Sequence, residues 1–369
     1  MKPLSSERIV VDGYLHAMEH FWEQGWTDGL PVVPPTEERV REFLAHARLE
    51  PDEVVGEYRI RDRAISAEKL AINAVMAGCL PEYMPILVAA CQAVTHPAFH
   101  LNHIASLASP WPFLIVNGPQ VKALKFNSGV YVFGPGTRAN ATVGRALSLV
   151  LANCMEARLG GIQRGAMGHA ARWGFCIAEN EDTSWAPLHV ERGFDRLANV
   201  VTAFPSGDCP TQVFGPAYEF AAEQWAEMLA MKLARSRFFF AIGAYVLVIS
   251  PGVQDVFAKA GWSKADLRRY IMDNCWETAA DLKRMGHWWY DGSPTGKAPA
   301  VQPGDDERRV YLFKREAWYE NDVWYDSGRE RRPDILIVVA GGDASPSGAM
   351  IGPYDLATNP VSQEVALSR

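Results

Sequence analysis

Apolar side chains recur at helical spacing in several stretches of the chain. Between residues 6 and 24 they stand three or four positions apart, which predicts a helix that ends at Gly25. A second run begins after Ser66, a residue type that caps helix N-termini, and Gly78 would end it. The stretch 81–94 is apolar on more sides, which predicts a more buried helix. Further helices are expected at 37–44, 141–155, 254–260 and 264–273.

Short apolar runs between these helices predict strands. They lie at 113–116, 130–133, 175–178, 245–249 and 335–340. Strands that alternate with helices indicate an α/β fold with mixed or mostly parallel sheets flanked by helices. We expect a helical N-terminal segment with a proline-rich loop at 1–65, and up to two α/β lobes at 66–235 and 236–369. Residues 284–333 carry weak signals for either element and are expected to form an aromatic and charged insertion.

Composition narrows the classes of function. The chain has 369 residues, of which 48% are apolar, and a formal net charge of −7. This much apolar material excludes disorder as the main state. The negative charge disfavours nucleic acid as a partner, because phosphate recognition needs clustered positive charge. The most apolar stretch, 238–249, is about half of the ~20 residues that span a bilayer, so no membrane partner is expected.

The cysteines and the N-terminus favour a cytoplasmic location. The cysteines form no C-x-x-C pair, which is typical of reduced thiols in a chain of this length. The first 20 residues lack the continuous apolar segment of a secretory signal. The six cysteines are Cys79, Cys91, Cys154, Cys176, Cys209 and Cys275.

A glycine loop before the predicted helix at 141–155 is a candidate anion site. It has the pattern G-x-G-x-x-A, and helix N-terminal amides favour negative charge. Two arginines would clamp a carboxylate from both sides. A dinucleotide site would need an acid at the end of a second strand, and Glu156 stands near the required distance but follows no strand. A plain tight turn is the other alternative. The expected binding residues are Gly134, Gly136, Arg138, Asn140 and Arg145.

Polar residues also crowd around the end of the predicted strand 175–178. Glu179, Asn180 and Glu181 follow it directly, with His169 before it and His189 after it. Ligands of open α/β sheets bind at the carboxyl ends of strands. The glutamates and histidines would act as general acid and base, with Asn180 as a substrate contact. The alternative is a solvated acidic turn.

Cys79 and Glu82 lie between two predicted helices. A thiol close to a helix N-terminus is a candidate nucleophile, and Glu82 is a candidate substrate contact. The alternative for Cys79 is a small buried apolar side chain. Within residues 334–348, an apolar strand runs into a glycine turn. This turn is either a further ligand site at the carboxyl end of a strand or a simple connection.

Histidine spacing permits a metal site, which we rank below the sites above. His96, His100 and His103 would face one ion if they were helical, but Pro97 indicates a turn. His16 to His20 matches an inverzincin pattern without a third ligand. We therefore expect no metal and no organic cofactor.

Five stretches of the sequence resemble a bacterial family associated with the UGSC motif, which is selenocysteine or cysteine followed by Gly-Ser-Cys. This chain has no such tetrapeptide, and its nearest strings are Ser206–Cys209 and Gly341–Ala344. The resemblance is therefore to the larger companion region, and it implies a small thiol- or selenol-bearing protein partner. The stretches are Gly25–Thr36, Ala71–Tyr83, Phe133–Arg145, Phe175–Glu181 and Gly261–Arg269.

Together these features predict an enzyme of the lyase or hydrolase type that acts on a small anionic substrate by acid–base chemistry, with assistance from Cys79. One alternative is a substrate-presenting subunit of a thiol or selenol redox system. Another is a metalloenzyme that uses the three histidines. Aromatic segments such as His287–Tyr290 are candidate interface anchors, so we expect a homo-oligomer.

Overall fold

The structure is a computed structural model of the whole chain. It describes residues 2–104, 110–159, 161–215, 220–235, 243–285, 306–313, 319–320, 323–326, 329–331, 334–353 and 359–366. Mixed parallel and antiparallel sheets with flanking helices confirm the predicted α/β class.

The chain folds into two compact units. Unit 1 comprises Met1–Glu181, Pro187–Cys209 and Asn359–Arg369, and unit 2 comprises Asp182–Ala186 and Pro210–Thr358. The expected boundary at 65/66 falls inside unit 1, because the N-terminal segment packs into the same core as the helices that follow it. The expected boundary at 235/236 falls inside unit 2, because the strand at Thr211–Phe214 pairs within the sheet of that unit.

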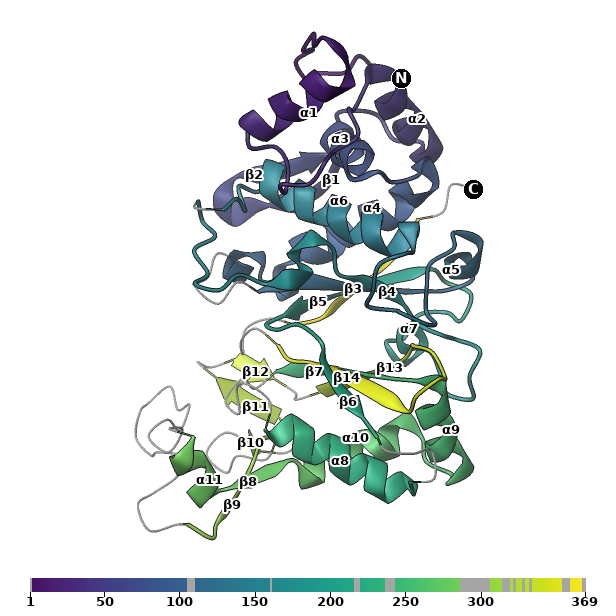
Figure 1. The fold of residues 1–369 in the computed structure, drawn as a ribbon, viewed down its shortest axis with the longest axis vertical. Coiled ribbons are helices and arrows are strands. Elements are labelled where there is room, and N and C mark those ends of the chain that lie inside the picture. The colour runs from purple at the N-terminus through teal and green to yellow at the C-terminus, as the bar shows by residue number, and fades with distance from the viewer. Residues whose placement is uncertain are drawn as a thin grey trace. The chain divides into compact units, whose positions relative to one another are not determined.

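Unit 1 contains a four-stranded sheet in the order β15–β5–β3–β4, of which β3, β4 and β5 are labelled in Figure 1. β3 and β4 are parallel, β5 is antiparallel to β3, and β15 is antiparallel to β5. Every residue of β3 and β5 is buried, as expected for central strands of nearly continuous apolar sequence. The strands are β3 (Trp111–Asn117), β4 (Cys176–Ala178), β5 (Val200–Ser206) and β15 (Val361–Glu364).

Helices stack on one face of this sheet (Figure 1). α4 packs on β5 and β15, α6 packs on β4, and α3 covers α6. A hairpin of β1 (Val54–Tyr58) and β2 (Arg63–Ser66) packs beside α4 and leads into α3. The helices are α1 (Gly13–Glu23), α2 (Glu37–Ala47), α3 (Ala67–Ala77), α4 (Met84–Thr95), α5 (Gln120–Ala123), α6 (Arg138–Cys154) and α7 (Leu188–Glu191), with 3₁₀ turns at Arg59–Arg61, Pro81–Tyr83, Pro97–Phe99, Leu101–Ile104 and Ala170–Trp173.

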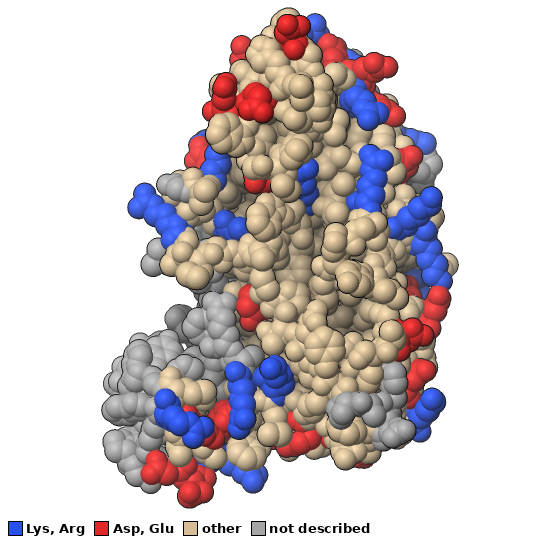
Figure 2. Space-filling view, viewed as in Figure 1, with Lys and Arg blue, Asp and Glu red and all other residues tan. Residues whose placement is uncertain are grey.

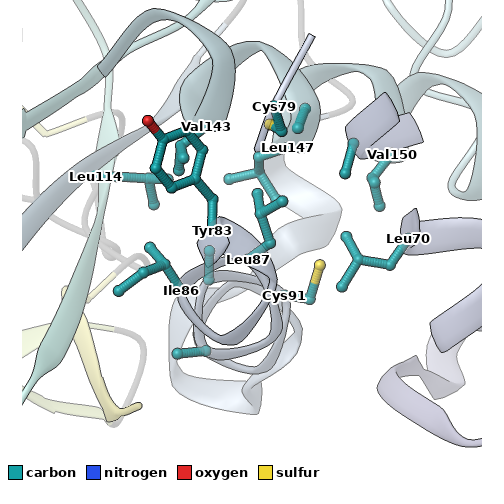
Figure 3. Packing of buried hydrophobic residues seen from close by; sticks show 14 of the residues in the cluster. Leu70, Cys79, Tyr83, Ile86, Leu87, Cys91, Leu114, Val143, Leu147 and Val150 are labelled. Carbon is teal, nitrogen blue, oxygen red and sulfur yellow. The ribbon is translucent and has the colours of Figure 1, made fainter. Parts of the chain in front are cut away.

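Local sequence signals explain where α2 and α3 begin and end. Thr36 accepts a hydrogen bond from the backbone N–H of Arg39, and Ser66 accepts one from Lys69. Gly78 ends α3 in the left-handed region, with φ 87°. These observations confirm the predicted start and end of the helix after Ser66. Side chains of α3, α4 and α6, among them Leu70, Leu87, Leu147 and Val150, meet in the core (Figure 3).

Unit 2 has its own four-stranded sheet, in the order β13–β7–β14–β6. β7 and β13 are parallel, and β14 is antiparallel to both β7 and β6. Its strands are β6 (Thr211–Phe214), β7 (Ala244–Ile249), β13 (Asp334–Val339) and β14 (Ser347–Ile351), and its long helices are α8 (Ala222–Ala234), α9 (Pro251–Lys259) and α10 (Lys264–Asn274). Trp225 of α8 and Phe257 of α9 are fully buried in the core of this unit.

The predicted insertion belongs to unit 2. In its described parts, β9 pairs with β8, a strand that precedes the insertion, and β10, β11 and β12 form a small antiparallel sheet. The bounds are β8 (Trp276–Thr278), α11 (Ala279–Arg284), β9 (Arg309–Tyr311), β10 (Tyr319–Glu320), β11 (Val323–Asp326) and β12 (Arg329–Arg331). His287–Tyr290, the candidate interface anchor, lies outside the described residues.

One predicted strand is wrong. Residues 130–133 form a turn, in which Tyr131 has φ 60° and the N–H of Gly134 donates to the Tyr131 carbonyl. Val130 and Tyr131 are exposed, so the apolar run does not enter a sheet. The glycine loop therefore follows a turn, which removes the strand-to-helix context on which its interpretation as an anion site rested.

Candidate functional site

Polar side chains gather where β3 and β4 end. The two strands are parallel, so their carboxyl ends lie at the same edge of the sheet. Nδ2 of Asn117, the last residue of β3, donates to Glu179 Oε2 at 2.7 Å and to Glu181 Oε1 at 3.0 Å. We call Asn117, Glu179, Glu181 and His189 the β3–β4 edge cluster. The structure thus brings together three of the residues predicted from sequence.

Glu179 is the structural member of the cluster. Its side chain is buried, and its Oε2 also accepts a hydrogen bond from the backbone N–H of Leu188 at 2.7 Å. Leu188 is the first residue of α7, so this bond fixes the start of the short helix that carries His189. Burial and these bonds suit Glu179 to positioning its neighbours rather than to touching a substrate.

Glu181 is the accessible carboxylate of the cluster. Its side chain is 22% exposed. Its Oε1 accepts from the backbone N–H of Gly118 at 2.6 Å as well as from Asn117. Both of these hydrogen bonds are accepted by Oε1. Oε2 is therefore the oxygen that can accept a proton from a ligand.

His189 stands behind Glu181 and is fully buried. Its Nε2 lies 3.3 Å from the carbonyl oxygen of Arg196, and its Nδ1 lies 3.8 Å from Glu181 Oε1. A carbonyl oxygen only accepts, so Nε2 carries the ring proton of the neutral imidazole. Nδ1 then presents a lone pair toward a carboxylate oxygen at a separation too long for a hydrogen bond, and it has no other hydrogen-bond partner among the described residues.

Asn117 and Gly118 were not among the residues predicted for the site. The signal was present, because an apolar strand that ends abruptly in an amide and a glycine places both at the sheet edge. Gly118 has φ 106°, and a Cβ there would lie 2.4 Å from the carbonyl oxygen of Ala198. Only glycine therefore lets this backbone N–H approach Glu181.

His169 lies at the other end of the strands. Its ring centroid is 6.4 Å from that of Phe175, which precedes β4, and its Nδ1 is 3.7 Å from Cys209 Sγ. Cys209 follows β5, which is antiparallel to β3. His169 therefore belongs to the amino ends of β3 and β4. Asn180 follows Glu179 at the carboxyl edge and is partly exposed.

The expected anion clamp is engaged in structural contacts. Arg138 Nε donates to the carbonyl of Gly78 at 2.9 Å, which satisfies the C-terminus of α3. Arg145 donates to both carboxylate oxygens of Asp28 at 2.7 and 2.8 Å. Asn140 makes a two-way amide contact with the backbone of Asn127. These contacts hold loops together, which gives the three side chains a structural role around the start of α6.

The two glycines of that loop play different parts. The backbone of Gly134 lies against the Tyr131 ring, which a Cβ would approach to 2.4 Å. Gly136 is exposed and has φ 114°. Both therefore belong to the turn that leads into α6.

Cys79 is a core residue. Its Sγ donates to the carbonyl of Thr142 at 3.3 Å, and burial raises the pKa of its thiol to about 12. Figure 3 shows it near Leu147, inside the packed cluster. The thiol therefore stays protonated and unreactive at neutral pH, which argues against a nucleophilic role. Glu82 is exposed on the 3₁₀ turn before α4 and takes no part in the hydrogen bonds of the β3–β4 edge cluster.

His96 and His100, two of the three histidines considered as ligands of one ion, flank the 3₁₀ turn Pro97–Phe99, and the backbone of His103 lies in the next turn, Leu101–Ile104. Nδ1 of His96 accepts from the N–H of Ala98, and His100 has φ 53°, so the segment is not the helix that a shared ion would require. The side chain of His103 lies outside the described residues. Across the residues that the structure describes, no group of three or more His, Cys, Asp or Glu side chains is placed to hold a metal.

Two surface features bear on partners. In the described segments, no helix combines the length and apolarity needed to cross a bilayer. Positive and negative side chains are interspersed on the face shown in Figure 2.

No known protein family matches the chain, and no curated protein has significant similarity to its sequence.

Proposed function

We propose that this chain is an acid–base enzyme for a small polar molecule, and that Glu181 exchanges the proton with the substrate. The observation that carries the proposal is the pairing of a partly exposed carboxylate with a fully buried imidazole, Glu181 Oε1 with His189 Nδ1 at 3.8 Å. A general acid or base must reach its substrate, and of these two groups only Glu181 is exposed.

His189 acts through Glu181 as a positioning residue and a proton store. Its Nε2–H faces the Arg196 carbonyl, so the ring orientation is set and Nδ1 is the basic nitrogen. When Glu181 takes a proton from the substrate, the neighbouring Nδ1 gives the pair a second place to hold it. When Glu181 returns the proton, the imidazole reverts to its neutral form.

The cluster favours a substrate group that donates hydrogen bonds. Its one accessible group is the Glu181 carboxylate, and behind it Asn117 Oδ1 is a buried acceptor with no hydrogen-bond partner among the described residues. Arg138 and Arg145 are engaged elsewhere, so the anionic character expected of the substrate has no support at this edge. Hydroxyl, amine and polarised C–H groups fit the acceptors present, and proton removal from such groups belongs to lyase and hydrolase chemistry.

The wider predictions remain part of this proposal. They are a cytoplasmic homo-oligomer, chemistry without an organic cofactor or metal, and a small thiol- or selenol-bearing partner.

A proton-exchange assay tests the proposal. The purified chain is incubated in D₂O with a panel of small ketones, hydroxy acids and amino compounds, and ¹H NMR follows the loss of C–H signals. We expect exchange for at least one compound, about 100-fold slower with Glu181→Gln. His189→Gln should also slow exchange, with the larger effect on kcat than on KM.

The matched control is Glu38→Gln, which removes an exposed carboxylate from the first turn of α2. It should leave the exchange rate unchanged. A compound that exchanges equally fast with Glu181→Gln would show that the proton passes through another group.

A further inference from the structure

The amino end of β3 carries a second polar cluster, formed by Arg172, Gln163 and Trp111. Arg172 lies in the 3₁₀ turn before β4, and its guanidinium carbon is 4.4 Å from the centroid of the Trp111 ring. Trp111 is itself fixed, because its Nε1 donates to Ser148 Oγ of α6 at 2.9 Å. The arginine thus rests on a rigid aromatic base.

The positive charge of Arg172 is not balanced within the described residues. Arg172 forms no ion pair with any described residue. Its guanidinium donates to the amide oxygen of Gln163, which carries no charge. Burial lowers its pKa to about 10, and no neighbouring acid counteracts this. A cation withdrawn from water without a counter-charge is unfavourable, and an anion at this point would relieve it.

Two donors in this cluster also lack acceptors. Arg172 Nε and Gln163 Nε2 are both buried and have no hydrogen-bond partner in the described part of the chain. Gln163 is only 3% exposed, so solvent does not satisfy its amide. Buried donors are nearly always paired in native proteins. Orphan donors on two adjacent side chains, beside an unbalanced charge, therefore indicate a missing acceptor.

The geometry points to a binding site for a small carboxylate at the amino end of β3, held by Arg172 Nε–H and Gln163 Nε2–H. A carboxylate supplies two acceptor oxygens for the two donors and the negative charge that Arg172 needs. β3 has seven residues. At about 3.3 Å per residue, its ends are roughly 20 Å apart, so this site is distinct from the β3–β4 edge cluster.

Acetate is the probe, because it is a small carboxylate and the Arg172 side chain is partly exposed. Protein labelled with ¹⁵N is titrated with sodium acetate against sodium chloride at equal ionic strength, and the arginine Nε–H and glutamine amide signals are followed by NMR. We expect saturable shifts of one arginine and one glutamine signal with acetate alone.

Three variants decide the assignment. Arg172→Gln should weaken acetate binding at least about tenfold. Gln163→Glu should also weaken acetate binding, because its new carboxylate would occupy Arg172 from within the chain. This variant keeps the contact with Arg172, so it provides the test if Arg172→Gln does not fold. Arg164→Gln, which removes an exposed arginine from the same loop, should bind acetate as the wild type does.

The site is excluded if acetate produces no saturable shift or if chloride reproduces it. It is equally excluded if binding survives Gln163→Glu or is lost with Arg164→Gln. These outcomes do not depend on turnover at Glu181, so they leave the proposed acid–base function untouched.

Discussion

Arg145 and Asp28 form a two-pronged ion pair that joins α6 to the proline-rich loop after α1. Nε and one terminal nitrogen of Arg145 donate to the two oxygens of Asp28 at 2.7 and 2.8 Å, and the two side chains are only 15% and 14% exposed. The same guanidinium donates to the carbonyl of Pro31 at 2.9 Å. A residue expected to bind substrate thus holds the N-terminal loop to the rest of unit 1.

Loss of this ion pair should destabilise the fold. Asp28→Asn leaves a mostly buried guanidinium without its charge partner, and we expect the free energy of unfolding to fall by about 2–3 kcal/mol. Urea unfolding of the purified variant measures this. Arg39→Gln, which removes an exposed ion pair with Glu42, is the control and should change stability by less than about 0.5 kcal/mol. Equal effects of the two variants would contradict the structural role of Arg145.

Replacing each of two glycines by alanine should distinguish the cost of backbone strain from the cost of a steric clash. Gly118 and Gly136 both have positive φ, at 106° and 114°, but only at Gly118 would a Cβ meet other atoms within 4 Å. We expect Gly136→Ala to cost about 1 kcal/mol of stability and Gly118→Ala about 3 kcal/mol. Thermal and urea unfolding provide the comparison. Gly118→Ala should also displace the N–H that binds Glu181, and similar costs for the two variants would refute the close approach.

Cys209 should be the reactive thiol of the native protein. Of the six cysteines, only Cys209 is exposed. Burial raises the thiol pKa of Cys91, Cys176 and Cys275. Native labelling with iodoacetamide, followed by peptide mass spectrometry, should modify Cys209 and leave Cys79 unmodified. Full unfolding in urea should then expose all six, which serves as the control. Rapid native labelling of Cys79 would mean that its enclosure in the core is wrong.

Glu68 should make stability depend on acid pH. Burial alone would raise its pKa, but hydrogen bonds from Ser5 and Ser6 outweigh burial, and the pKa of Glu68 lies below its usual value. The unfolded chain then binds this proton more readily than the folded one does, so stability is gained above the unfolded pKa and lost as pH falls through the folded pKa.

Urea unfolding between about pH 3 and pH 7 tests this linkage. Glu68→Gln should lower stability at pH 7 and flatten the loss of stability on acidification. Glu38→Gln, at an exposed position, should keep the wild-type slope. An unchanged slope for Glu68→Gln would show that Ser5 and Ser6 do not hold the carboxylate in solution.

Local signals in the sequence were sufficient for much of the fold. Ser66 and Gly78 bound α3 as predicted, and the apolar runs at 113–116 and 245–249 became β3 and β7. Such features can be predicted because a helix cap or a continuous apolar run depends only on residues that are close together in the sequence. The run at 130–133 was wrongly predicted as a strand, because it forms a turn in which Val130 and Tyr131 are exposed.

The pairing of distant residues was decided by tertiary structure. The order of residues along the chain placed Glu179 and Glu181 after a strand, and Arg138 and Arg145 in the first half of a helix. Only the parallel register of β3 and β4 brought Asn117 between the two glutamates, and only the packing of the N-terminal loop gave Arg145 its carboxylate. Charge and hydrogen-bonding capacity are written in the residue types, whereas which groups satisfy one another depends on contacts across more than 60 residues of chain.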